Sequence, residues 1–286
     1  MAISLQTNVA ALSASAKLNR TSEQLAGVFE RLSSGLRITR PGDDPAGNQV
    51  ADQLRADSKL ATTAIQNAST AISFTAIADS ALSEVSGLLT RMAELAEQSA
   101  NGVFANSQRS ALSNEFTALG SEIQRIAQTT EFNGLALLSS GQSVVIQVGL
   151  DGGANSRLTL DSIDGTLEAL GLAQTGSNAL TFSILDNTDV NSQSAARLAL
   201  DAVTTAIDRL NKTRGGLGAA ESRLNTAIST LGSIREQFVA AEGRIRDADI
   251  ALEAAELVRL QVLQQAQTAV AAQANQQVGF ALHLLG

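Results

Sequence analysis

Residues 260–286 read LQVLQQAQTAVAAQANQQVGFALHLLG and contain no Lys, Arg, Asp or Glu. Ala, Gln and Leu dominate this stretch, and all three are good helix formers. Its apolar residues recur at steps of three and four, which places them on one face of a helix. They are Leu260, Leu263, Ala266, Val270, Ala274, Val278, Ala281 and Leu285. An uncharged helix with such a face must bury it, so its partner is to be sought elsewhere.

A membrane is not the partner that this composition predicts. Seven Gln and one Asn interrupt the stretch, too many for a span of about 20 apolar residues. Nucleic acid is also disfavoured, because the net charge is −8 and residues 41–240 hold twenty-one acidic against twelve basic side chains. The first residues lack the basic and apolar regions of a secretory signal peptide. Other helices are therefore the expected partners.

The composition as a whole is typical of long helices. Trp, Tyr and Cys are absent and Pro occurs twice, whereas Ala, Leu, Ser and Gln are abundant. The absence of Cys excludes disulfides, thiolate metal sites and cysteine nucleophiles. We expect a mainly α fold: an elongated antiparallel helical bundle or coiled coil in which the N- and C-terminal helices pair.

The N-terminal residues 3–38 are the expected partner helix. Leu5, Val9, Leu12 and Ala16 step by three and four, and Leu18, Leu25 and Leu32 step by seven. We expect this helix to pair with the last one, about 244–285, and with copies of itself in other molecules. Isolated helices gain little without packing, so both ends are expected to order only on assembly.

Both prolines of the chain lie in the segment Arg40-Pro41-Gly42-Asp43-Asp44-Pro45-Ala46-Gly47. Pro41 stops the first helix, and Asp44 followed by Pro45 is typical of an N-cap and a first helical residue. We therefore predict a joint between two segments at 39–45. Arg31, Arg37, Asp43 and Asp44 could form salt bridges near it, or serve only in capping and solubility.

Helices are predicted at about 46–99, at 106–128 and from 191 onward. The last carries a rod seam of residues spaced by seven: Val203, Leu210, Leu217, Leu224, Leu231 and Phe238. The second seam position is expected at Leu200, Ile207, Arg214, Glu221, Ile228 and Arg235. Such a two-position repeat predicts a coiled-coil or bundle seam.

Residues 140–190 lack the helical period. Val144–Val148 and Arg157–Leu160, separated by Asp151-Gly152-Gly153, predict a β-hairpin in an exposed, turn-rich insert. The expected layout has a terminal coiled-coil domain (1–40 and 243–286), a helical rod domain (41–139 and 190–242) and this insert (140–189).

Several motifs resemble the bacterial flagellin family. They are Glu30–Ile38 (ERLSSGLRI), Asp43–Gly47 (DDPAG), Glu94–Gly102 (ELAEQSANG), Glu131–Gly134 (EFNG), Leu263–Ala266 (LQQA) and Ala272–Gln276 (AQANQ). The resemblance covers about 1–140 and 190–286. It implies a short-form subunit, without large outer domains, of the extracellular flagellar filament.

The resemblance also implies partners. The subunit would assemble with itself into a helical homopolymer and leave the cell unfolded through the flagellar type III system. An export chaperone would bind the C-terminal segment, and hook-associated and cap proteins would be neighbours. The polar Gln and Asn face of residues 260–286 would then line an aqueous channel, a hypothesis that follows from the resemblance.

In the same family, positions that match Arg91, Leu95 and Glu115 contact the flagellin-sensing Toll-like receptor of vertebrates. Arg91 and Leu95 are four apart and share a helix face. The alternative is that Arg91 and Glu115 are structural surface charges and that Leu95 packs in the rod. Ala93 and Glu97 depart from the residues common in the family.

No catalytic, cofactor or metal site is expected. His283 is the only histidine, so a zinc-binding HExxH helix is excluded, and Asp151, Asp161 and Asp164 lack the spacing of a calcium-binding EF-hand. The alternatives to a filament subunit are a hook–filament junction protein, an enzyme on a helical scaffold, and a helical chaperone or adaptor with a folded monomer.

Overall fold

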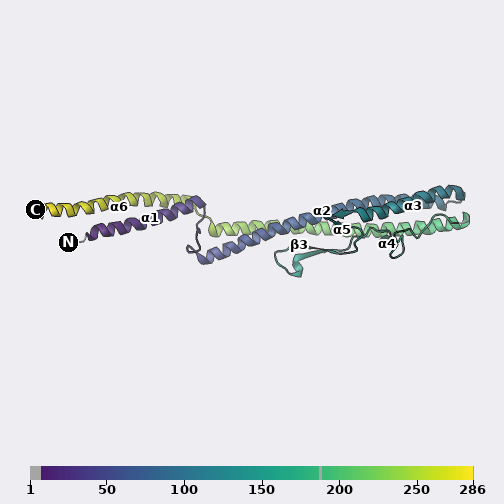
Figure 1. Ribbon diagram of the computed structural model, residues 1–286, viewed down its shortest axis with the longest axis horizontal. Coiled ribbons are helices and arrows are strands. Elements are labelled where there is room, and N and C mark those ends of the chain that lie inside the picture. The colour runs from purple at the N-terminus through teal and green to yellow at the C-terminus, as the bar shows by residue number, and fades with distance from the viewer. Residues whose placement is uncertain (1–7, 187–188, 286) are drawn as a thin grey trace. The chain divides into compact units, whose positions relative to one another are not determined.

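The computed structural model describes residues 8–186 and 189–285, with side chains throughout except at 189–190 and 277–285. Its long helices are α1 (Val9–Ser34), α2 (Pro45–Ala100), α3 (Asn106–Thr129), α5 (Asp189–Arg246) and α6 (Ile250–Leu285) (Figure 1). Between them lie the short helix α4 (Leu167–Leu170), a 3-10 turn (Ala154–Ser156) and two antiparallel hairpins. The predicted mainly α class with long paired helices is confirmed.

The chain forms two compact units. One contains the chain up to Ser58 and from Arg235 onward, and the other spans Lys59–Ile234. Helices α2 and α5 contribute residues to both units. Among the described residues, no helix is long and apolar enough to cross a membrane.

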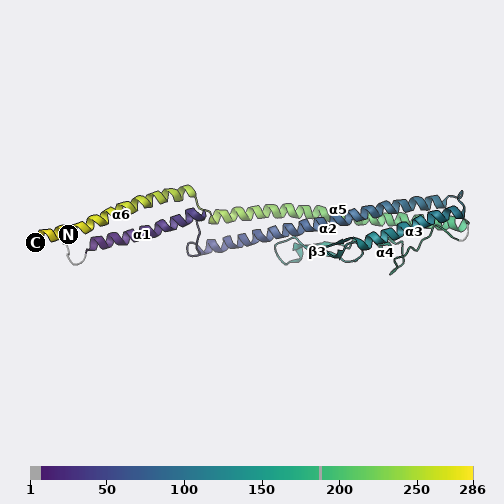
Figure 2. The same cartoon turned by 45° about the horizontal axis from the view of Figure 1, so that its top comes forward.

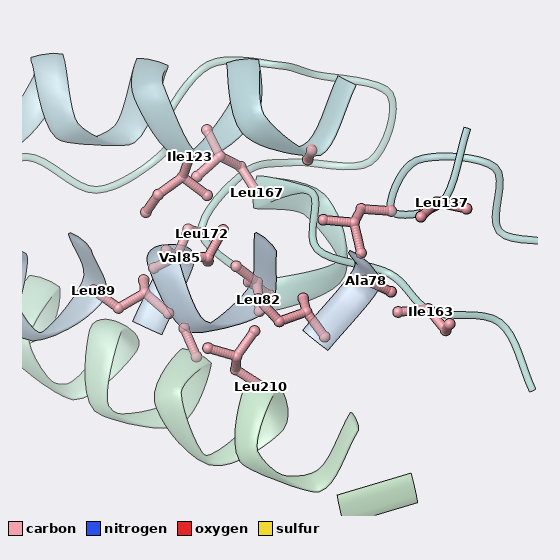
Figure 3. Close-up of a cluster of buried hydrophobic side chains, with 14 of the residues drawn as sticks. Ala78, Leu82, Val85, Leu89, Ile123, Leu137, Ile163, Leu167, Leu172 and Leu210 are labelled. Carbon is pink, nitrogen blue, oxygen red and sulfur yellow. The ribbon is translucent and has the colours of Figure 1, made fainter. Parts of the chain in front are cut away.

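The Lys59–Ile234 unit has a continuous core in which α2 is the central helix. Buried residues of α2 step by three and four from Ala61 to Ser99, so one face of the helix is buried over this range. Figure 3 shows Leu82, Val85 and Leu89 of α2 between Ile123 of α3 and Leu210 of α5. Helix α2 therefore holds both neighbours.

The rod seam lies on the α5 side of this core. Its residues from 203 to 231 are buried and Phe238 is half-buried. The predicted second position is only partly covered: Leu200, Ile207 and Ile228 are half-buried against the core, and Glu221 is exposed. Ala199 and Ala206, one residue earlier in the heptad, are the fully buried ones. Small side chains there let α5 approach its partner closely.

The insert is less exposed than its polar composition predicts. Strands β3 (Val144–Gln147) and β4 (Arg157–Leu160) pair as the predicted hairpin. The strands, α4 and the loops between them nevertheless place apolar side chains in the core cluster, and these side chains fix the insert on the helices. They are Ile146, Leu158, Leu160, Ile163, Leu167, Leu170, Leu172 and Ile184.

A second hairpin, β1 (Glu131–Phe132) with β2 (Leu135–Ala136), was not expected from the sequence. Asn133 and Gly134 form its turn with φ of 52° and 76°. Positive φ at both central residues is the geometry of a type I′ hairpin turn, which favours Asn-Gly. The Asn-Gly pair thus forms a hairpin rather than simply ending the helical segment.

Two helix ends differ from the predicted ones. Helix α1 stops at Ser34 rather than Ile38, because Gly35 adopts φ 71° and its N–H bonds the carbonyl of Arg31. Helix α6 begins at Ile250 rather than 244. Asp249 caps it by accepting hydrogen bonds from the N–H groups of Ala251 and Leu252.

Candidate functional site

Helices α1 and α6 run side by side in both views (Figures 1 and 2). The covered positions of each step alternately by three and four, which is the heptad pattern of a coiled-coil seam. We call this set the terminal seam: Ala11, Ala14, Leu18, Thr21, Leu25, Val28 and Leu32 of α1, with Glu253, Leu257, Leu260, Gln264, Gln267, Ala271 and Ala274 of α6.

Three contacts set the register of this antiparallel pair. Arg31 Nε donates to Glu253 Oε1 at 2.7 Å, and Gln264 Nε2 donates to Ser22 Oγ at 3.3 Å. Asn8 Nδ2 donates to the carbonyl of Ala274 at 3.0 Å. They span the helix pair and agree on one alignment, so the terminal seam has a single register.

In this register the layers of the terminal seam bury less apolar surface the farther they lie from the joint at residues 39–45. Apolar layers of Leu25, Val28, Leu257 and Leu260 come first, and layers containing Gln264 and Gln267 follow. Alanine layers come last. Gln267 Oε1 is buried with no hydrogen-bond partner among the described residues. An unsatisfied buried polar atom costs about 1–3 kcal/mol.

The residues predicted for polymerisation divide between this seam and the surface. Leu260 and Ala274 are buried in the terminal seam, and Leu25 and Leu32 are half-buried there. Val9, Leu12, Leu263 and Val270 are exposed, Val9 by 66% and Val270 by 61%. Leu5 and the side chains of Val278 and Leu285 lie outside the described residues.

Helix α6 therefore carries more apolar surface than α1 covers. Val258, Val262 and Val270 are all more than half exposed, and their spacing by multiples of four makes them one ridge. Phe29 of α1 is also exposed. A contiguous bare apolar ridge of this kind marks a surface for further packing.

The polar face of α6 is not wholly directed to solvent. Gln264 and Gln267 lie in the terminal seam, whereas Gln265 and Gln273 are exposed. The predicted channel lining is therefore limited, among the described side chains, to the exposed members of that face.

Residues 35–37, which follow α1, form hydrogen bonds to the segment where α5 ends and α6 begins. Arg37 N–H donates to the carbonyl of Arg246, and Ala248 N–H donates to that of Gly35 at 2.9 Å. The Arg37 guanidinium donates to the carbonyl of Ile245 at 2.8 Å, at the end of α5. A cation at a helix C-terminus is favourable. Residues 35–37 thus fix the course of residues 245–248.

Arg31 and Glu253 form the least exposed ion pair across the terminal seam. The Glu253 side chain is 10% exposed and that of Arg31 31%. The second oxygen of Glu253 is buried without a partner among the described residues. Glu253 is not among the residues that the sequence predicts for this contact, because charge counts do not show which carboxylate an arginine pairs with.

The predicted joint residues shape the loop before α2. Asp43 Oδ2 accepts hydrogen bonds from Arg40 N–H, Thr39 N–H and Thr39 hydroxyl, which hold the pKa of Asp43 below its usual value. Asp44 Oδ1 accepts from Gly47 N–H at 2.9 Å and caps α2, whose first residue is Pro45. Pro41 lies in the turn that the hydrogen bond from Asp43 N–H to the carbonyl of Arg40 closes.

Of the predicted salt bridges, Arg37–Asp44 is present at 3.8 Å with both side chains exposed. Arg31 instead pairs with Glu253, and Asp43 is occupied by the loop hydrogen bonds. Exposed pairs contribute about 0–1 kcal/mol, so capping is the larger role of the two aspartates.

The three residues predicted for receptor contact are not equally accessible. Arg91 pairs with Glu115 and with Glu94, each at 2.9 Å, and these pairs raise the pKa of Arg91. Arg91, Glu94 and Glu115 are exposed. Leu95 is fully buried in the core cluster, so it offers no side-chain surface in this structure.

The described residues show no three His, Cys, Asp or Glu side chains gathered to hold a metal ion. His283 lies outside the described side chains.

Comparison with known proteins agrees with this arrangement. Residues 5–143 match the bacterial flagellin N-terminal helical region, and residues 200–285 match the bacterial flagellin C-terminal helical region. Flagellin of Halalkalibacterium halodurans is 37% identical over 279 residues, which cover 97% of this chain and 98% of the relative. The flagellar filament 33 kDa core protein of Treponema phagedenis is 34% identical, with the same coverage.

A solved structure of a putative flagellar hook-associated protein from Vibrio parahaemolyticus shares the fold. Its TM-score is 0.58 at 15% identity, and the match covers 72% of this chain and 100% of that one. The two family models together span most of the chain and include both helices of the terminal seam. This chain therefore belongs to the bacterial flagellin family.

Proposed function

We propose that the chain is a structural subunit that polymerises into the bacterial flagellar filament for swimming motility. The observation that carries this is the exposed apolar ridge of α6, Val258, Val262 and Val270, beside a terminal seam that is already occupied by α1. The ridge is exposed in the described part of one molecule, and neighbouring copies of the chain can cover it. Its role is structural rather than catalytic.

The test is seeded elongation of purified protein, followed by negative-stain microscopy. Long filaments that grow on sheared seeds support the proposal. A chain that stays monomeric, or that stops after a short ring at hook ends, contradicts it, and the second result is the behaviour of a hook–filament junction protein.

The domain layout and partners belong to the same proposal. The terminal domain would comprise 1–40 and 243–286, the rod 41–139 and 190–242, and the insert 140–189. The non-helical segments 35–44 and 247–249 support a division near those boundaries. Export through the type III system, a chaperone on the C-terminal segment, and cap and hook-associated neighbours follow from family membership.

For the vertebrate Toll-like receptor, we propose that Arg91 and Glu115 form the accessible part of the contact. Both are exposed, and the buried Leu95 would act by supporting the helix that carries Arg91. Arg91→Ala and Glu115→Ala should each weaken activation of receptor-expressing cells by monomer. Unchanged activation by both would contradict the assignment.

A further inference from the structure

Charge on the Lys59–Ile234 unit is divided between two helices. Residues 209–223 of α5 hold four basic side chains and one acidic one, although the whole chain is acidic. Residues 79–97 of α2 hold four acidic side chains and one basic one. Among the described residues, one ion pair joins these stretches, Arg214 with Asp79 at 2.8 Å. Lys212 and Arg223 of α5 and Glu84 of α2 take no part in an ion pair within that part of the chain.

The basic stretch borders a groove of about 440 Å³ between β4 and α5, which we call the basic groove. Its floor is apolar, with Leu160, Ile163 and Leu217 buried. The exposed carboxylate of Asp161 also lines it. The cations Lys212 and Arg223 line it and are exposed, and neither takes part in an ion pair among the described residues. They are eleven residues apart, or three helical turns, so they share one face about 16 Å apart.

The acidic stretch borders a second groove of about 530 Å³ between α2 and α3, the acidic groove. Ile77, 41% exposed, and Leu88 supply apolar surface, and Glu84 and Glu122 supply carboxylates. Glu84 is exposed with no ion pair among the residues described. Glu122 pairs with Arg125 at 2.5 Å at the groove's edge, and that pair lowers the pKa of Glu122.

We propose that the acidic groove of one copy binds the basic-groove face of another copy. The basic groove is lined by two basic side chains and one acidic one, and the acidic groove by two acidic side chains and one basic one, so the two faces have opposite net charge. Both linings also contain apolar residues, and different elements build them. A contact between two different faces of one chain generates a filament when its rotation does not close into a ring. The occupant is thus a second copy of this chain, and the inference rests on the proposed function and specifies which surfaces meet.

The glycines of α5 support the approach of a helix to the basic groove. Gly216 lines it, and a Cβ built at Gly216 would meet no atom within 4 Å. Gly215 and Gly218 flank it and are equally open. The α5 surface between Lys212 and Arg223 therefore has no side chains at three glycine positions and basic side chains at both ends, and a helix that carries a carboxylate, such as α2 with Glu84, can approach it closely.

Charge reversal with rescue tests this contact. The first variant carries Lys212→Glu and Arg223→Glu, the second carries Glu84→Lys and Glu122→Lys, and the third carries all four changes. For each variant and for the parent, the elongation rate is measured on seeds made only of that same protein, and the filament yield is measured at low salt. Circular dichroism checks that each variant is folded. A control carries Lys59→Glu and Arg157→Glu, exposed basic residues outside both grooves.

The first and second variants should each lose at least tenfold in elongation rate, because each then has two faces of like charge. The four-change variant should recover most of the rate, and an equimolar mixture of the first two should form mixed filaments. The control should elongate like the parent. Parent-like elongation by both reversed variants, or a four-change variant no better than either, overturns the inference. Failure of the parent itself to form filaments counts against the proposed function instead.

Discussion

At the residue scale, the terminal seam contains a built-in weakness. Gln267 occupies a seam position, and its Oε1 is buried without a partner among the described residues. Neighbouring layers of alanine bury little area. A seam of this kind pairs α1 with α6 in one register but leaves room for other helices to contribute stability.

Replacing Gln267 with Leu should strengthen the α1–α6 pair. The change removes an unsatisfied polar atom and adds apolar area, a gain of about 1–3 kcal/mol for local opening of the pair. Hydrogen exchange of α1 and α6 amides in the monomer measures it. Gln265→Leu, at an exposed position of the same helix, is the matched control and should leave exchange unchanged. Equal protection in both variants would contradict the seam assignment.

Asp79 gives the rod a pH-dependent contact. Its hydrogen bond to Arg214 lowers the pKa of Asp79 from 3.8. Because the folded-state pKa is depressed, the stabilisation is complete above about pH 4 and is lost as pH falls through the folded value. The melting temperature of Asp79→Asn should lie below that of the parent at pH 7, and the gap should narrow as the pH falls below about 4. A constant gap across this range would be inconsistent with the pair.

At the element scale, the rod seam carries much of the stability of the Lys59–Ile234 unit. Leu224 is fully buried, so Leu224→Ala should lower the free energy of unfolding by about 2–5 kcal/mol. Leu198→Ala is the control on the same helix, since Leu198 is 63% exposed, and should cost little. Denaturant unfolding followed by circular dichroism measures both. Similar midpoints for the two variants would refute the burial of the seam.

The sequence predicted this helix well because one series of large residues, spaced by seven, coincides with the buried face. It was less accurate at the second seam position, where Ala199 and Ala206 are fully buried and the bulkier Leu200 and Ile207 are half-buried beside them. Side-chain size ranked the candidates in the wrong order. Small residues are selected where two helices approach most closely, and that distance is a property of the pair, not of one helix.

In the terminal helices, the sequence does not show which partner each residue contacts. The spacing of the apolar residues of α6 predicts a single helix face, yet Leu260 and Ala274 are buried against α1 whereas Val270 is exposed. A helix that packs on more than one partner has two interleaved apolar faces, and their sum looks like one broad stripe. Arg31 was placed near the joint, but its partner Glu253, more than 200 residues away, could not be identified without the fold.

At the scale of the whole molecule, the two units differ in how completely they bury their apolar surface. The Lys59–Ile234 unit closes its core with its own helices and insert. The other unit leaves valines and leucines of α1 and α6 exposed. Flagellin family membership explains the difference, because a filament subunit completes its packing with its neighbours.

This contrast should be visible in hydrogen exchange. In the monomer, amides of α1 and α6 should exchange much faster than those of α2 and α5 within the Lys59–Ile234 unit, because local stability follows buried apolar contacts. In filaments, protection of α1 and α6 should rise to the level of the rod. Full protection of both helices already in the monomer would indicate a self-sufficient fold, as expected of a helical adaptor.

The central claim is that neighbouring copies cover the exposed apolar ridge of α6. The direct measurement is the critical concentration for elongation of Val270→Asp on parent seeds, with Val270→Leu as the conservative control. A charge buried in an interface without a partner is costly, so Val270→Asp should raise the critical concentration at least tenfold. Its rod should still melt with the parent, and Val270→Leu should elongate normally. If Val270→Asp elongates at the parent's critical concentration, the ridge is not an assembly surface and the account is wrong.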